Sequence, residues 1–144
     1  MRVEADPGFK IGTRKADRAR VARVIGFEVY DNEINDAPTP TRAFYIARYP
    51  VTVAQFRAFV EAKKIKVGDA DALRDPDNRP VRYVTWREAM VYCDWLSEQL
   101  RGDAAPERLR EMVRSNKWRV TLPSELEWEK AARSGLKDAI FSWG

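Results

Sequence analysis

Residues 118–133, WRVTLPSELEWEKAAR, decide the fold of this chain, because they join a predicted short strand to a helix that carries its own start signal. Ser124 is a natural N-cap, and the side chain of Glu127 can accept a hydrogen bond from the backbone N–H of Ser124, which completes a capping box. Pro123 keeps the chain extended before the cap, and Gly135 offers an easy stop. The stretch therefore predicts a helix of about ten residues that follows an extended segment.

The same succession of an extended apolar pair, a threonine cap and an aromatic-rich helix occurs twice more. Thr52 with Gln55 predicts one helix, and Thr85 with Glu88 predicts another. A short charged helix is expected at residues 106–114. Helical spacing predicts that the core-facing residues are Val53, Phe56, Phe59 and Val60 of the first helix and Trp86, Ala89, Met90, Cys93, Leu96 and Leu100 of the second.

The chain before Thr52 is expected to be mostly extended. Alternating or β-forming residues predict strands at residues 9–13, 24–30 and 44–49. The charged residues 14–23 and the aperiodic residues 65–79 are predicted to be loops. The fold class expected from these elements is α+β, with much irregular structure.

Composition narrows the possible functions. Apolar residues make up 44% of the 144 residues, which is ample for a packed core. No run approaches the roughly 18 apolar residues of a membrane span, and no signal peptide opens the chain, so we expect a cytoplasmic protein without a membrane partner. A single cysteine excludes an internal disulfide framework. The complete lack of histidine removes the commonest general base and a common metal ligand.

Two charged stretches raise binding hypotheses, and in both cases a solvated loop is the simpler interpretation. The basic run is interrupted by Asp17 and lacks interleaved aromatics, so no nucleic-acid partner is predicted; it comprises Arg14, Lys15, Arg18, Arg20 and Arg23. The acidic run resembles a calcium loop in composition but lacks the glycine and the final glutamate of an EF-hand, so no metal is predicted; it comprises Asp69, Asp71, Asp75, Asp77 and Asn78.

No catalytic, cofactor-binding or metal-binding residue is predicted in this chain. Cys93 has apolar helical neighbours, which favours a buried, inert thiol over a metal ligand. Glu125, Glu127 and Glu129 raise the hypothesis of an acid/base site, but two of them lie in a helical first turn, which explains them without catalysis. Trp86 and Trp128 are expected to pack in the core.

Several motifs, taken in order, resemble the formylglycine-generating enzyme (sulfatase-modifying factor) family. Each combines a proline, a hydroxyl cap and aromatic helix residues. They are Tyr49-Pro50-Val51-Thr52 with Gln55 and Phe59; Pro80-Val81, Val84-Thr85-Trp86, Ala89, Tyr92-Cys93 and Trp95-Leu96; and Leu122-Pro123-Ser124-Glu125, Glu127-Trp128-Glu129 and Ala131-Ala132-Arg133. Residues 9–12 and 141–144 look like the family's F-x-x-G turn and its aromatic-x-Trp-Gly.

The resemblance implies a C-type-lectin-like fold, of which residues 1–144 would be the N-terminal part of one domain, incomplete before the C-terminal half. Family enzymes oxidise a sulfatase cysteine to formylglycine with oxygen and with copper held by two cysteines. Those cysteines, and most calcium-site residues, belong to the C-terminal half. Copper and calcium are therefore implied only for a complete family enzyme.

Two functional hypotheses remain open. The first is a non-catalytic or incomplete domain that acts as a binding or scaffold module for a protein or peptide partner. The second is a fragment of a copper-dependent formylglycine-generating oxidase whose catalytic cysteines lie beyond Gly144. Under either hypothesis we expect exposed apolar surface, so the chain should need the missing half or self-associate.

Overall fold

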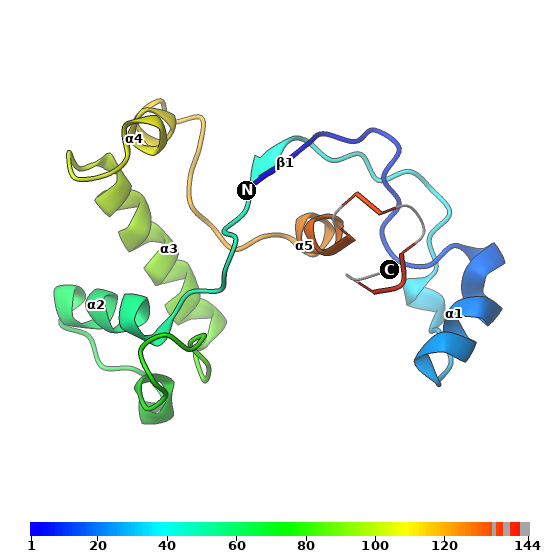
Figure 1. Ribbon diagram of the computed structural model, residues 1–144, viewed down its shortest axis with the longest axis horizontal. Helices are drawn as coiled ribbons and strands as arrows, with labels where there is room; N and C mark the ends of the chain where they lie inside the picture. The colour runs from blue at the N-terminus through cyan, green and yellow to red at the C-terminus, as the bar shows by residue number, and fades with distance from the viewer. Residues whose placement is uncertain (134, 137–138, 142–144) are drawn as a thin grey trace. The chain divides into compact units, whose positions relative to one another are not determined.

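The computed structural model describes residues 1–133, 135–136 and 139–141, and shows a mixed structure rich in helix with little sheet (Figure 1). The chain divides into two compact units. The first unit contains Met1–Arg48 and Pro123–Gly144, and the second contains Tyr49–Leu122. Within the described residues, no helix has both the length and the apolar character needed to cross a bilayer.

The first unit consists of one small sheet and short helices. Strands β1 and β2 pair antiparallel, with Arg2 opposite Tyr45. The elements of this unit are β1 (Arg2–Val3), η1 (Lys15–Asp17), α1 (Arg18–Ile25), η2 (Asp31–Glu33), β2 (Phe44–Tyr45) and α5 (Glu125–Arg133).

Backbone pairing in the first unit continues well beyond the two short strands. Asp6 and Thr41 exchange two backbone hydrogen bonds of 3.0 Å each. The N–H of Thr39 donates to the carbonyl of Phe9, and the N–H of Thr13 donates to the carbonyl of Glu33. Residues 1–13 therefore run beside residues 33–46 as one paired segment, which we call the entry ribbon.

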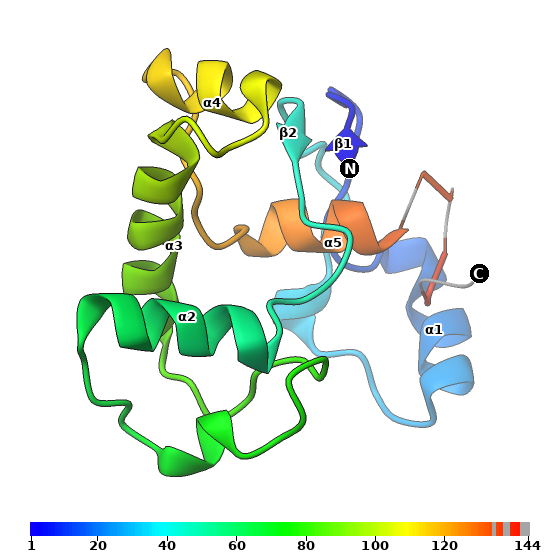
Figure 2. The same ribbon diagram turned by 60° about the vertical axis from the view of Figure 1, so that its left-hand side comes forward.

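The second unit holds an aromatic core between two helices. Its elements are α2 (Val53–Lys63), η3 (Ala70–Leu73), α3 (Trp86–Arg101) and α4 (Glu107–Arg114). Figure 2 shows α2 beside the N-terminal half of α3, with α4 at the other end of α3. Phe56 and Phe59 are at most 1% exposed and pack against Tyr92, with ring centroids 5.8 and 5.5 Å from its ring. Trp95 joins the cluster at 5.6 Å from Phe59.

The three predicted capping boxes are confirmed. In each box the cap hydroxyl accepts from the third residue of the helix, and the side chain of that residue accepts from the N–H of the cap. The pairs are Thr52 with Gln55, Thr85 with Glu88, and Ser124 with Glu127. The short helix expected at residues 106–114 is also confirmed, as α4.

Most of the strands predicted before Thr52 are wrong. Residues 18–25 form α1, because their arginines and alanines favour a helix, and Gly26 then ends it in the left-handed region at φ 83°. Residues 26–30 are consequently irregular, and residues 9–13 form no strand, since they pair with residues 33–39 only through isolated bonds. The third predicted strand, at residues 44–49, shortens to Phe44–Tyr45.

The strand predicted at the start of the deciding stretch is also wrong. Residues 118–122 are extended without a partner strand. The N–H of Val120 donates to the hydroxyl of Ser97 in α3 at 3.1 Å, so a side chain replaces the strand ladder. The helix that follows, α5, runs as predicted, and Gly135 has the positive φ of 77° expected of a helix stop.

Two core predictions for tryptophans are wrong. Trp86 is 71% exposed and Trp128 is 62% exposed, although their positions at the starts of α3 and α5 match the apolar helix pattern. The pattern marks the correct faces, but no described segment covers these two ends. Of the aromatic-x-Trp-Gly motif at residues 141–144, only Phe141 lies within the described residues.

The loop at residues 64–79 is fastened to α3 through Glu88. One carboxylate oxygen accepts from the N–H of Gly68 at 2.8 Å, and the other accepts from the N–H of Thr85 at 2.8 Å. The bond from Gly68, followed by those from Thr85, lowers the pKa of Glu88 below its ordinary value of 4.5. The ionised form is therefore the one that the folded state favours.

We expect Glu88→Gln to destabilise the second unit by about 1 to 2 kcal/mol near pH 7. Because the pKa of Glu88 is lower in the folded state, its stabilisation is fully present above its unfolded pKa and is lost as pH falls through the folded value. Urea unfolding at neutral and acidic pH measures this. The gap between the parent chain and the variant should narrow in acid. Glu98→Gln, which removes only a surface ion pair to Lys63, serves as the matched control.

Candidate functional site

The strongest concentration of polar contacts lies on one side of α5. Glu129, Lys130 and Arg133 occupy positions i, i+1 and i+4 of the helix, and their side chains contact the entry ribbon. These side chains are between 10% and 25% exposed. We call these three side chains and their ribbon partners the polar clamp.

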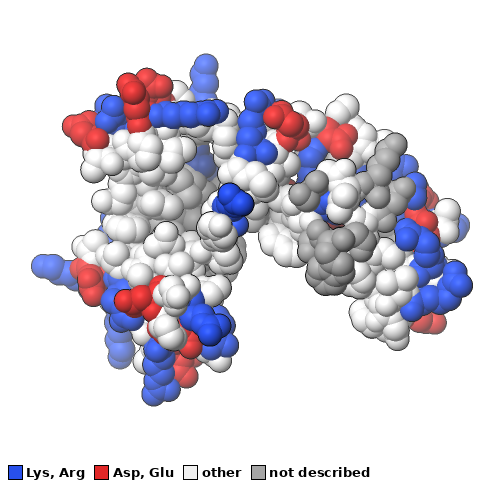
Figure 3. Space-filling model, viewed as in Figure 1, with Lys and Arg blue, Asp and Glu red and all other residues white. Residues whose placement is uncertain are grey.

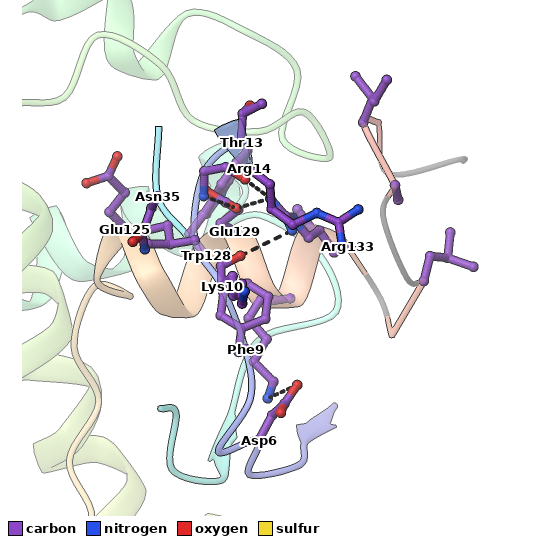
Figure 4. A pocket seen from close by; sticks show the side chains of 18 of the residues that line it. Asp6, Phe9, Lys10, Thr13, Arg14, Asn35, Glu125, Trp128, Glu129 and Arg133 are labelled. Atoms are coloured by element: carbon purple, nitrogen blue, oxygen red, sulfur yellow. Dashed lines mark hydrogen bonds and ion pairs between the residues drawn. The ribbon is translucent and has the colours of Figure 1, made fainter. Parts of the chain in front are cut away.

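The first part of the polar clamp surrounds Gly12. The carboxylate of Glu129 accepts from the N–H of Gly12 at 2.8 Å, while Arg133 donates to the carbonyl of Gly12 at 2.7 Å (Figure 4). Arg133 also donates to the carbonyl of Lys10 and forms an ion pair with Glu129. Both backbone groups of Gly12 are thus bonded by charged groups, which contribute about 1.5 to 3 kcal/mol per bond.

The second part of the polar clamp centres on the buried ammonium group of Lys130. It donates to the hydroxyl of Thr41 at 2.7 Å and lies 3.7 Å from the carboxylate of Asp6. It also lies 5.5 Å from the centre of the Phe9 ring, and the guanidinium of Arg133 lies at the same distance from that ring. Phe9 therefore contacts two cations, an arrangement that the negative face of an aromatic ring favours.

An open cavity lies beside the polar clamp, and its lining includes Phe9, Trp128, Glu129 and Arg133 (Figure 4). Among the described residues, no buried side-chain nitrogen or oxygen lacks a hydrogen-bond partner. The polar groups that line this cavity are consequently already used to hold the chain together. This arrangement favours a structural role for them over proton transfer to a substrate.

The three glutamates of α5 do not gather into an acid/base pair. Glu125 points away from the polar clamp, and Glu127 is occupied by its capping box with Ser124 (Figure 4). Glu129 bonds to Gly12 and Arg133. The sequence interpretation missed this role of Glu129. The available signals were its i, i+4 spacing to Arg133 and the glycine of the F-x-x-G turn.

Cys93 is buried in α3, as the sequence predicts. Burial, and secondarily the neighbouring charge of Asp94, raises the pKa of the thiol above its ordinary value, so the reactive thiolate is disfavoured. Across residues 1–133, 135–136 and 139–141, no three side chains of the His, Cys, Asp and Glu types gather into a candidate metal site.

The acidic run at residues 69–78 is neutralised by arginines. Arg82 donates twice to Asp75, and Arg57 contacts Asp77 at 3.3 Å. Asp71 pairs with Arg74 and belongs to η3, whose N-cap is Asp69. Each of these four carboxylates therefore has a partner other than a cation from solution.

The basic run is likewise interspersed with acids. Asp17 contacts both Arg14 and Arg20, and the hydrogen bond from Arg14 is the main cause that lowers the pKa of Asp17. Arg18 pairs with Asp31 at 2.7 Å. Figure 3 shows basic and acidic atoms interspersed on the face in view. Local pairing of this kind is typical of a solvated helix and not of a phosphate-binding groove.

The decisive comparison is with a family model described as "Sulfatase-modifying factor enzyme 1-like domain", which matches residues 9–144. The chain belongs to this family. The match begins at Phe9, the first residue of the F-x-x-G turn that the polar clamp holds.

Relatives within the family differ in activity according to their names. A formylglycine-generating enzyme from Thermomonospora curvata is 29% identical over 106 residues, which cover 74% of this chain. A formylglycine-generating enzyme from Bos taurus is 32% identical over 76 residues, or 53% of this chain. The "Inactive C-alpha-formylglycine-generating enzyme 2" of Bos taurus is 31% identical over 77 residues, or 54% of this chain.

The matched region is a small part of each relative. It spans 27% of the length of the Thermomonospora enzyme, and 14% and 18% of the two bovine proteins. Family membership thus covers proteins named as active and as inactive.

Proposed function

We propose that this chain is a non-catalytic framework of a sulfatase-modifying-factor-like domain, which adopts the lectin-like arrangement of the family and acts as a cytoplasmic binding or scaffold module. The observation that carries the proposal is the state of its one thiol. Cys93 is buried and its pKa is raised, so it is neither an accessible nucleophile nor half of a copper-binding cysteine pair. The polar clamp adds support, because its charged groups are engaged in holding the entry ribbon.

An aldehyde assay tests the absence of catalysis. The 144-residue chain is incubated with copper, oxygen and a cysteine-containing sulfatase peptide, and aldehyde is measured by hydrazide labelling and mass spectrometry. We expect none, whereas the Thermomonospora relative serves as the positive control. Formation of aldehyde by this chain, and its loss in Cys93→Ala, would contradict the proposal.

A second candidate function is supported by the names of two relatives, which are formylglycine-generating enzymes. Under this alternative the chain is the framework part of a copper-dependent oxidase, and the catalytic cysteines are supplied by sequence beyond Gly144. The two candidates differ in one observation. A coding sequence downstream of Gly144 that encodes two nearby cysteines, and restores aldehyde formation when expressed with this chain, would favour the oxidase.

The partner surface that we propose is aromatic. In the second unit Tyr83 is 55% exposed and Trp86 is 71% exposed. Tyr83 has a positive φ of 56°, which is unusual for a bulky residue and costs free energy. Large exposed aromatic side chains of this kind are typical of surfaces that a protein or peptide covers.

We expect Trp86→Ser to reduce self-association while it leaves stability nearly unchanged. The side chain is mostly exposed, so its removal takes little buried area from the fold, and surface substitutions usually change stability by about 0.5 kcal/mol or less. Sedimentation velocity and urea unfolding measure the two effects. Trp95→Ser is the contrasting variant, because Trp95 packs in the aromatic core. A large loss of stability in Trp86→Ser would contradict the exposed position.

A further inference from the structure

We propose that the entry ribbon detaches from α5 as a unit, with its internal pairing intact, when the polar clamp opens. The first unit would then have a conformational step that precedes its unfolding. The inference rests on how the ribbon is held together and on how it is attached.

The entry ribbon is held together by its own backbone. Arg2 pairs with Tyr45, Asp6 with Thr41, and Phe9 with Thr39. The ammonium group of Met1 also donates to the carbonyl of Ile46 at 2.8 Å. These bonds run along the length of the ribbon and involve no atom of α5, so they survive when α5 moves away.

The attachment of the ribbon to α5 is polar. The described hydrogen bonds and ion pairs between them come from Glu129, Lys130 and Arg133. Among the described residues of the first unit, only Val29 belongs to the buried apolar set, whereas the second unit buries an aromatic cluster. Little apolar area therefore opposes separation, and the charged contacts decide it.

These contacts lie close together on α5, so their opening is expected to be cooperative. Glu129 and Arg133 pair with each other, and both bond to Gly12. Loss of the carboxylate charge weakens the bond to the N–H of Gly12 and the orientation of Arg133 at the same time. Local opening of this kind is detected by amide hydrogen exchange without global unfolding.

Amide exchange of single residues in the 144-residue chain tests the proposal. The N–H of Gly12 bonds to Glu129, so its exchange reports detachment, whereas the N–H groups of Asp6 and Thr41 bond within the ribbon and report its pairing. In Glu129→Gln we expect exchange at Gly12 to accelerate roughly tenfold or more. Exchange at Asp6 and Thr41 should stay unchanged, as should exchange at Phe56 in the second unit.

Two further measurements make the test decisive. Glu125→Gln removes the same charge from a side chain of α5 that points away from the ribbon, and it should leave Gly12 unchanged. In the parent chain, about 1 M salt should accelerate exchange at Gly12 before it affects Thr41, because the charges are screened. The proposal is overturned if Gly12 and Thr41 accelerate together, if Glu129→Gln leaves Gly12 unchanged, or if Glu125→Gln has the same effect.

Discussion

Replacement of Gly12 by alanine is expected to unfold the first unit while the second unit stays folded. Gly12 has a φ of 77°, and a Cβ atom at this position would lie against the backbone carbonyl of Glu33, closer than real Cβ atoms approach. The substitution therefore imposes both left-handed strain and a steric clash on the turn that Glu129 and Arg133 hold. Backbone strain of this kind costs about 1 to 3 kcal/mol by itself.

The expected total exceeds this strain, because Gly12 cannot shift without breaking its bonds to charged groups. The loss of two such bonds adds about 1.5 to 3 kcal/mol for each. Two-dimensional NMR of the variant measures the result: signals of the first unit should collapse while those of α2 and α3 persist. Gly26→Ala is the matched control, since its φ of 83° brings strain but nothing lies near the added Cβ. Equal effects of the two substitutions would show that the clash with Glu33 is unimportant.

Replacement of Phe59 by alanine is expected to give the largest loss in the second unit. The ring is fully buried and contacts Phe56, Tyr92 and Trp95 with centroid distances between 5.3 and 5.6 Å. Removal of such a side chain typically costs about 3 to 5 kcal/mol, from lost transfer free energy and from the cavity that remains.

Urea unfolding followed by circular dichroism measures this loss, and Phe59→Leu should recover part of it because it refills most of the space. Phe27→Ala is the matched control in the first unit, since Phe27 is 63% exposed. If Phe59→Ala cost less than about 1 kcal/mol, the aromatic cluster would not be the core of the second unit.

Helix starts were the most predictable part of this fold. Each capping box uses residues three positions apart, so Thr52, Thr85 and Ser124 could be identified as caps from local sequence alone. The faces of α2 and of the middle of α3 followed from helical spacing, and Phe56, Phe59 and Cys93 are buried as expected. Local rules succeed here because the relevant partners lie within one turn of the helix.

The N-terminal part could not be predicted in the same way. Val24 and Ile25 are β-forming residues, but they belong to α1, where the preceding arginines and alanines extend the helix to Gly26. Residues 9–13 alternate like a strand, yet their pairing depends on residues 33–39, which a local pattern does not reveal. The polar clamp was missed for the same reason, since Glu129 and Gly12 are separated by 117 positions.

Cys93 provides a built-in probe of the second unit. Its sulfur is buried in α3 next to Tyr92 of the aromatic cluster, and burial raises the pKa of the thiol. A maleimide or a disulfide reagent can therefore modify it only during the moments when α3 and its neighbours open. Because the chain has a single cysteine, the rate of that modification counts openings of one unit without any engineered label.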